Sequence, residues 1–361
     1  TSGKQIEADY EGASDGKVQL RRSDGKSFEV PLSRLSADDQ AFVEEQMASA
    51  PAPAAVAAAS SGSISGGGAD WPSWRGAKRD GISPDTGLKS SWPSSGPDLL
   101  WTYENAGKGY SAPAIVGGVY YISGSRDGQA LIIALNADSG EELWASEIGE
   151  DPEDGYSTGW GAGTRGALTV SEGKVYAMSA NGDLACVNAA DGTAVWSVSM
   201  TDDFGGKVPN WGYSEAPLVD GEKLLVTPGG KDGAIVALDK ASGKEIWRSE
   251  DLEDAAAYSS IIVADVNGKR QYIQLFQNTL AGVDAASGEV LWTSDWPDGR
   301  TAVIPTPIYT DGHVYMTSGY GAGCKLVKID GDEAEDVYEN KEMINHHGGV
   351  VLVDGHVYGF T

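Results

Sequence analysis

The sequence lacks a surplus of positive charge: 26 lysines and arginines stand against 53 aspartates and glutamates, which gives a formal net charge of −27. Such a field repels phosphate backbones and anionic headgroups, so nucleic acid and anionic membranes are excluded as general partners. No apolar run reaches eighteen residues, so no transmembrane segment is expected. No signal peptide is visible either, but the chain starts at Thr1 and stops at Thr361 in mid-pattern, and we expect both natural ends to be missing.

Cysteine is almost absent, with only Cys186 and Cys324 in the chain. Two cysteines make no disulfide framework, and their spacing is not that of a metal site. Because they belong to different repeats, described below, we expect two small buried hydrophobes rather than a bridge. Helical periodicity is also nearly absent between residues 70 and 361, which excludes solenoids built from helix pairs.

What the sequence does contain is a thirteen-residue motif, here called the turn phrase, that occurs four times. Its form is apolar-Ala/Gly/Val-x-Asp/Asn-x-x-Ser/Asp-Gly-x-x-apolar-Trp, and the copies are 132–144, 184–196, 235–247 and 280–292. Each copy carries one turn glycine and ends in one tryptophan: Gly140 and Trp144, Gly192 and Trp196, Gly243 and Trp247, Gly288 and Trp292. The tryptophans are spaced by 52, 51 and 45 residues, a period that indicates a repeat architecture.

Each copy predicts a β-hairpin, because a short polar side chain and a glycine supply the bend between two apolar strands. A second phrase precedes the hairpins: Ser-x-Pro, a short spacer, Gly and a Val-Tyr strand. It stands, with variations, at 110–121, 164–176, 213–226 and 304–315. Two hairpins in each period make four antiparallel strands, which is one propeller blade. We expect the repeat tryptophans and glycines to be structural, with the indoles packed between blades.

The turn phrase resembles the tryptophan-docking motif of the eight-bladed pyrroloquinoline quinone (PQQ)-like propellers, over residues 70–361. That superfamily includes quinoprotein alcohol dehydrogenases and the non-enzymatic lipoprotein BamB of outer-membrane assembly. The stretch Trp71-Pro-Ser-Trp74-Arg-Gly76 resembles the start of secreted PQQ-like repeat proteins of planctomycete-type bacteria. The resemblance implies an all-β, PQQ-like propeller, incomplete here, and a periplasmic or extracellular location.

The visible repeats predict about five blades and the start of a sixth. Asp98-Leu-Leu-Trp101 is expected to be a Trp strand that completes the last blade of the full protein, and the sixth blade is expected to start at Asn345. The fifth blade ends irregularly, because residues 325–338 replace the Ser-Gly turn and Trp with an acidic loop and Tyr338.

Residues 1–47 predict a separate small module of three strands followed by a short helix. Asp-Gly pairs at 15–16 and 24–25 mark tight turns, and Ser36 is expected to cap the helix with Asp39 at its third position. The module is SH3-like and resembles the first homology domain of the yeast actin-patch adaptor Sla, which implies protein binding but no endocytic role here. Residues 48–69 are Ala, Pro, Ser and Gly with few other residues and no charge, which predicts a flexible linker.

No catalytic set is found. The PQQ dehydrogenases of the superfamily that this chain resembles use an Asp base and a calcium ion held by Glu, Asn and Asp. None of these can be assigned to a residue here. Gly161-Ala-Gly163-Thr-Arg-Gly166 has the dinucleotide-binding spacing, but it precedes a strand instead of following one, so we read it as a loop. The acidic loop 330–336 lacks calcium-loop spacing; a solvated loop is favoured over an adventitious calcium site. We therefore predict no cofactor, with PQQ and calcium as the alternative.

His346-His347 stands at the start of a predicted inner strand, near the axial channel where propellers bind ligands. Adjacent strand residues point to opposite faces, so the pair is not expected to chelate one metal. The candidate ligand face is completed by aromatic and polar residues of two loops, suited to sugar or peptide stacking: Trp160, Arg165, Asn210, Trp211, Tyr213, His346 and His347. The alternative is that these side chains only pack their loops.

Three functions remain open from the sequence. The first is a non-catalytic, exported binding or scaffold protein with unidentified protein partners. The second is a quinoprotein dehydrogenase of alcohols or sugars. The third is a carbohydrate-binding propeller.

Overall fold

The structure is a computed structural model that describes residues 8–14, 17–22, 27–36, 39–43, 68–297 and 302–360. The chain divides into two compact units, Thr1–Ala57 and Ala58–Thr361. In the described ranges, no helix is long and apolar enough to cross a membrane.

The first unit contains a three-stranded antiparallel sheet in the order β1-β2-β3. Its elements are β1 (Ala8–Ser14), β2 (Lys17–Arg22), β3 (Ser27–Pro31) and the 3-10 turn η1 (Leu32–Arg34), followed by helical residues 39–43. The Asp39 N–H donates to Ser36 Oγ over 3.1 Å, so Ser36 caps this helix as its sequence predicts. The predicted turns at 15–16 and 24–25 lie outside the described residues.

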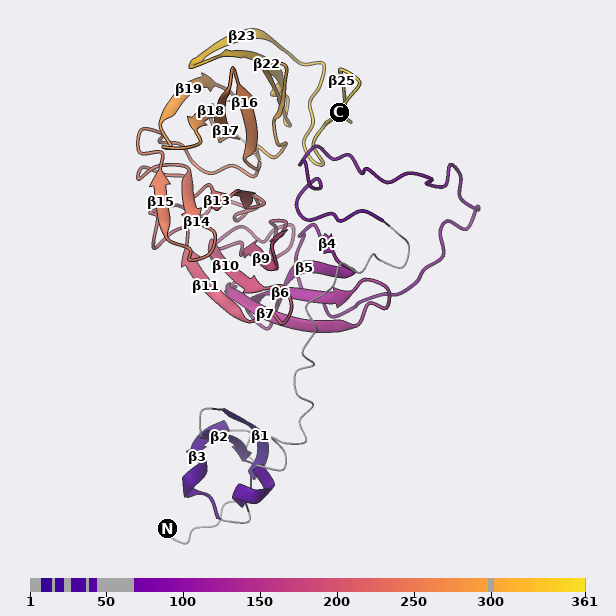
Figure 1. Cartoon of the computed structure of the whole chain (residues 1–361), viewed down its shortest axis with the longest axis vertical. Helices are drawn as coiled ribbons and strands as arrows, with labels where there is room; N and C mark the ends of the chain where they lie inside the picture. The colour runs from indigo at the N-terminus through magenta and orange to yellow at the C-terminus, as the bar shows by residue number, and fades with distance from the viewer. Residues whose placement is uncertain are drawn as a thin grey trace. The chain divides into compact units, whose positions relative to one another are not determined.

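The second unit is built from four-stranded antiparallel sheets whose strands follow one another in chain order (Figure 1). Blade 1 consists of β4 (Ala114–Val116), β5 (Val119–Arg126), β6 (Gln129–Asn136) and β7 (Glu142–Glu150). Blade 2 consists of β8 (Thr169–Ser171), β9 (Lys174–Met178), β10 (Asp183–Asn188) and β11 (Ala194–Ser199). Blade 3 consists of β12 (Leu218–Asp220), β13 (Lys223–Val226), β14 (Val236–Asp239) and β15 (Glu245–Arg248).

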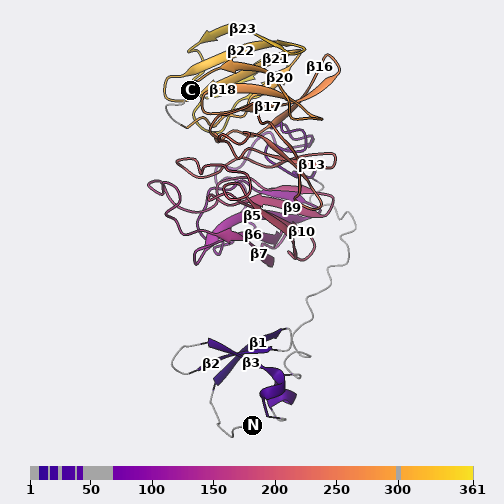
Figure 2. The ribbon, with the colours of Figure 1, turned by 90° about the vertical axis from the view of Figure 1, so that its left-hand side faces the viewer.

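Blade 4 consists of β16 (Ile262–Val266), β17 (Lys269–Leu275), β18 (Thr279–Asp284) and β19 (Val290–Asp295). Blade 5 consists of β20 (Ile308–Thr310), β21 (His313–Ser318), β22 (Gly323–Asp330) and β23 (Glu333–Asn340). The pair β24 (Val351–Val353) and β25 (His356–Tyr358) forms a two-stranded sheet, here called blade 6. From the side, the blades succeed one another from β5–β7 to β20–β23 (Figure 2). The expected all-β, PQQ-like propeller class is confirmed.

The core lies between the blades. Consecutive residues are buried along the inner strands, as from Leu184 to Val187 of β10, so each sheet offers two apolar faces and must cover both with a neighbour. Ile132 of blade 1 and Val175 of blade 2 share one buried cluster, and Leu280 of blade 4 shares another with Val314 of blade 5. Cys186 and Cys324 are both free and buried in such clusters, as expected.

The repeat tryptophans join each blade to the next one. A Cβ at Gly192 would lie 2.6 Å from the Trp144 ring, and Trp144 Nε1 donates to Ala189 O over 3.2 Å. Trp196 is placed in the same way on Gly243 of blade 3. The indole therefore lies flat on a turn that only glycine can occupy, both for its positive φ and for space.

Two tryptophans depart from this pattern. The Trp247 ring lies on Gly288, but Trp247 Nε1 is buried without a hydrogen-bond partner. Trp292 does not dock on the next blade's turn: its Nε1 donates to Gln271 Oε1 of its own blade over 2.8 Å. The cause is the turn of blade 5 between β22 and β23, which lacks the Ser-Gly phrase.

The segment 98–101, which the sequence predicts to complete the last blade of the full protein, forms no strand with the residues that the structure describes. Leu100 is 83% exposed, and no described strand lies in position to pair with this segment. Trp101 still lies against Gly140 of blade 1 and donates from Nε1 to Ala137 O over 2.9 Å. The docking contact thus forms without the strand, because it depends only on the ring and the turn.

Residues 71–81 cross the inner strands of several blades. Trp71 exchanges backbone hydrogen bonds with Ile115 of blade 1. The buried Arg79 guanidinium donates to Ala216 O over 3.0 Å, next to the start of blade 3. Arg75 donates to Val350 O, next to the start of blade 6. This segment therefore ties together blades that are distant in the chain, and it places Trp74 among their inner ends.

Candidate functional site

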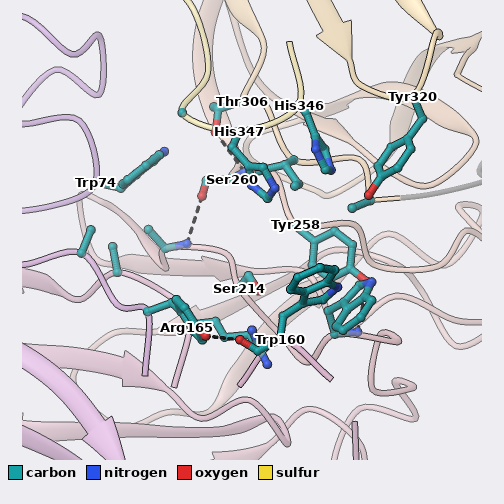
Figure 3. A pocket seen from close by; sticks show the side chains of 18 residues that line it. Trp74, Trp160, Arg165, Ser214, Tyr258, Ser260, Thr306, Tyr320, His346 and His347 are labelled. Carbon is teal, nitrogen blue, oxygen red and sulfur yellow. Dashed lines mark hydrogen bonds between the residues drawn. The ribbon is translucent and has the colours of Figure 1, made fainter. Parts of the chain in front are cut away.

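A pocket of about 720 Å³ opens where the inner strands of all six blades converge (Figure 3). Its size is in the usual range for small-molecule sites. Because every blade contributes to the wall, the pocket lies on the axis about which the blades are arranged.

The wall follows a simple register. In each blade, the residue four positions before the innermost strand lines the pocket: Tyr110, Arg165, Ser214, Tyr258, Ile304 and His347. In blades 1 to 5, the residue two positions before that strand also lines it: Ala112, Ala167, Ala216, Ser260 and Thr306. Extended backbone directs every second side chain the same way. The layer nearer the strands therefore has small side chains, and the second layer is varied, with large side chains in every blade except at Ser214 of blade 3.

Longer loops add further rings. Trp160 comes from the loop between β7 and β8 and is 80% exposed, and Trp211 comes from the loop between β11 and β12. Tyr320 lies in the turn between β21 and β22, and Trp74 belongs to the crossing segment. Figure 3 shows Trp74, Trp160 and Tyr320 around the pocket. Eight of the eighteen lining residues carry an aromatic or imidazole ring.

Five of the seven predicted ligand-face residues line this pocket: Trp160, Arg165, Trp211, His346 and His347. Asn210 does not line it, although its carbonyl accepts from Ser157 N over 2.7 Å and so links two pocket loops. Tyr213 was wrongly placed on this face. It is 1% exposed, its hydroxyl donates to Pro228 O over 2.8 Å, and burial raises its pKa.

The sequence predicted that the two histidines point to opposite faces of a strand. That prediction is wrong. They lie in a loop before β24, and their ring centroids are 3.9 Å apart. Tyr320 packs edge-on against His346 at 4.3 Å. Burial, and then the neighbouring His347, lower the pKa of His346. Among the described residues, no group of three potential ligands from His, Cys, Asp and Glu comes together, so the pair has no further metal-binding partner there.

Arg165 is held in place by its own loop. Its Nη2 donates to Gly161 O over 2.7 Å, and its guanidinium lies 5.4 Å from the Tyr110 ring and 5.2 Å from the Tyr156 ring. Tyr156 is fixed in turn, because its hydroxyl donates to the buried Asp151 over 2.9 Å. In the part of the chain that the structure describes, no carboxylate pairs with Arg165.

Two buried hydroxyls add polar character to the inner wall. Ser260 Oγ accepts from Ala216 N over 3.0 Å, and Thr306 Oγ1 accepts from Ser260 N over 3.3 Å. Since an oxygen of each hydroxyl already receives a backbone N–H, its hydrogen remains to be donated. The pocket thus combines aromatic faces with hydrogen-bond donors.

This donor set does not fit a calcium–quinone pair. Calcium takes carboxylate and carbonyl oxygens as ligands, and the lining contains no Asp, Glu, Asn or Gln side chain in the described ranges. The only charged lining residue is Arg165, which repels a cation. The residues present therefore do not make the metal site that the dehydrogenase chemistry requires.

The sequence reasoning missed Trp74, Tyr110, Tyr258 and Tyr320. Tyr110 and Tyr258 could have been found, because each stands four positions before an innermost strand, as Arg165 does. Trp74 carried no such signal, since its position follows from the crossing segment and not from the repeat.

The fold and the pocket define a class, a repeat β-propeller with an aromatic axial pocket. The family model described as "Outer membrane protein assembly factor BamB" (PQQ_2) matches residues 128–361, and the chain belongs to this family. A second model, "SLA1 homology domain 1, SHD1", matches residues 1–50.

The curated relatives are of two kinds. The chain is 31% identical over 112 residues to the outer membrane protein assembly factor BamB of Salmonella typhimurium, which covers 30% of this chain and 27% of that protein. It is 30% identical over 156 residues to the quinohemoprotein alcohol dehydrogenase ADH-IIG of Pseudomonas putida, covering 42% and 21%. The matched part thus spans about a quarter of the length of these relatives.

A solved structure, the quinohemoprotein alcohol dehydrogenase from Comamonas testosteroni, superposes with a TM-score of 0.52 at 16% identity, over 90% of this chain and 54% of that one. At this identity the likeness shows the fold alone.

Proposed function

We propose that this chain is a non-catalytic, exported binding protein that holds a partner at the aromatic pocket of its propeller. The observation that carries the proposal is the make-up of that pocket: flat aromatic side chains from several blades surround a single arginine, and no carboxylate faces it in the described ranges. Such a surface binds by stacking and hydrogen bonding.

The relatives support a scaffold function. One group is named for the assembly of outer membrane proteins, which is a binding task and not a turnover. The match of residues 1–50 to an adaptor-type domain adds a second binding module. Two modules on one chain raise the effective concentration of each for a partner that both hold. A periplasmic or extracellular location belongs to this proposal.

The dehydrogenase alternative is less well supported. The quinohemoprotein relatives use the same fold, but the pocket here lacks the oxygen ligands for calcium. Carbohydrate binding is the second candidate, because the exposed Trp160 and the neighbouring Trp211 offer the flat faces on which sugar rings stack.

The proposal is tested by photo-crosslinking in the producing cells. A benzophenone amino acid at Trp160 should give specific adducts, whereas the same group at exposed Lys244, in a peripheral turn, should not. The intact protein is also assayed for dye reduction with PQQ, calcium and alcohols, and no turnover is expected. Quinone-dependent turnover, or equal adducts at both positions, would contradict a non-catalytic pocket-binding function.

A further inference from the structure

Building on the proposed binding function, we propose that the pocket binds a sugar chain ending in a carboxylate-bearing pyranose, with Arg165 pairing with the carboxylate. The ligand is thus the terminal uronate residue of a glycan, and one such terminus binds in the pocket. Three features of the pocket support this proposal: its hydrogen-bond donors, its positive charge and its aromatic rings.

Several polar groups that face the pocket have hydrogens to donate. The Ser260 and Thr306 hydroxyl oxygens already accept backbone N–H groups, so their hydrogens are available to new acceptors. The indole nitrogens of Trp160 and Trp211 have no acceptor among the described residues, and an indole can only donate. A ligand rich in acceptor oxygens, such as a sugar with ring, hydroxyl and carboxylate oxygens, complements this set.

Arg165 selects for negative charge. It is the only charged residue in the lining, and in the described ranges no carboxylate neutralises it. Its Nη2 donates to Gly161 O over 2.7 Å and to Ser157 O over 3.4 Å, and its Nε is buried without a hydrogen-bond partner. Tyr110 and Tyr156 keep the guanidinium in place. The remaining nitrogen, Nη1, has N–H groups that can donate to a carboxylate.

The rings define what surrounds the carboxylate. Trp160 and Tyr320 are largely exposed, and Trp211 and Tyr258 line the pocket with them. The backbone N–H of Trp211 donates to Tyr258 Oη over 3.2 Å, so the Tyr258 hydroxyl is tied to the loop that carries Trp211. Pyranose rings present apolar C–H faces with a polar edge, and they match flat aromatic walls crossed by donors.

A peptide fits less well. A peptide carries negative charge only at acidic side chains and at its C-terminus, so most peptide segments leave the Arg165 guanidinium without a charged partner. A polyuronate lying along the protein surface is also disfavoured, because the protein carries a net charge of −27 and repels a long polyanion. A single acidic terminus avoids both penalties.

The test is a calorimetric titration of the whole chain with a matched pair of trisaccharides, one ending in glucuronate and the other in glucose. The acidic trisaccharide is expected to bind at least tenfold more tightly. Arg165→Gln should abolish this preference, so that the ratio of the two affinities falls to about one. Trp160→Ala, at a largely exposed residue, should weaken both sugars alike, and the matched charge control Lys244→Gln should change neither.

Arg165→Lys separates charge from loop structure, since it keeps the positive charge and should retain part of the preference. Equal affinity for the two sugars in the unaltered chain, binding of neither, or a preference that survives Arg165→Gln would overturn the proposal. A chain that binds neither sugar but still gives a protein adduct at position 160 would refute the glycan and leave the binding function standing.

Discussion

At the scale of single residues, the turn glycines have two separate requirements. Gly192 has a φ of +71°, and a Cβ there would lie 2.6 Å from the Trp144 ring. We expect Gly192→Ala to destabilise the propeller by about 3 kcal/mol, the sum of left-handed backbone cost and steric overlap. The measurement is urea unfolding followed by Trp fluorescence.

Gly173 is the matched control, because its φ is +75° but no atom lies within 4 Å of a Cβ built on it. Gly173→Ala should therefore cost only about 1 kcal/mol, the backbone part. Equal losses in the two variants would mean that the indole contact adds nothing.

The buried Glu215 makes stability depend on pH. Its carboxylate accepts from Thr227 Oγ1 over 2.8 Å, yet burial raises its pKa to about 7. The folded state therefore holds a proton that the unfolded chain releases near pH 4.5, so this residue's contribution to stability falls as pH rises from about 4.5 to about 7. Chemical unfolding at pH 5 and pH 8 should show a loss on the order of 3 kcal/mol from this group.

Glu215→Gln should remove that fall, because an amide does not titrate. The difference in unfolding free energy between the unaltered chain and the variant isolates Glu215 from all other carboxylates. A difference that stays constant from pH 5 to pH 8 would show that the carboxyl ionises normally.

At the scale of elements, the loop between β7 and β8 is fixed by a carboxylate outside the pocket. Asp151 accepts from Ser125 Oγ over 2.5 Å and from Tyr156 Oη over 2.9 Å, and Tyr156 supports Arg165. Asp151→Asn should replace charge-assisted hydrogen bonds with weaker ones and loosen this loop. We expect hydrogen exchange in residues 152–165 to rise at least tenfold, and ligand affinity to fall.

Asp183→Asn serves as a comparison, since Asp183 bonds to Ser179 in blade 2 and does not touch Tyr156. It should leave exchange in 152–165 unchanged. Unchanged exchange in Asp151→Asn as well would mean that the loop is held by its backbone contacts alone.

The elements also show how far the sequence could lead. The turn phrase identified the blades because it includes both the glycine of the turn and the type of residue, a tryptophan, that packs on such a turn. It failed for Trp292, since docking needs the partner turn of the next blade, and that turn has a different sequence. Tyr213 was misplaced for a related reason: the pattern shows that a loop is aromatic but not which ring turns inward to Pro228.

At the scale of the whole molecule, the net charge of −27 acts against compactness. Salt screens repulsion between surface carboxylates, so raising NaCl from 10 mM to 500 mM should increase the melting temperature by several degrees. Scanning calorimetry measures this shift. A variant with Glu333, Glu335 and Glu339 of the exposed strand β23 changed to Gln should show a smaller increase. A melting temperature that falls with salt would show that attractive ion pairs dominate instead.

The register of the pocket wall has a consequence for how such proteins diversify. The docking tryptophans and turn glycines hold the blades together, whereas the residue four positions before each innermost strand faces the pocket and is of five different types in six blades. Ligand specificity and fold stability thus depend on different positions of the same repeat. A descendant of this chain can exchange one side chain per blade, in any combination, and present a new recognition surface on an unaltered frame.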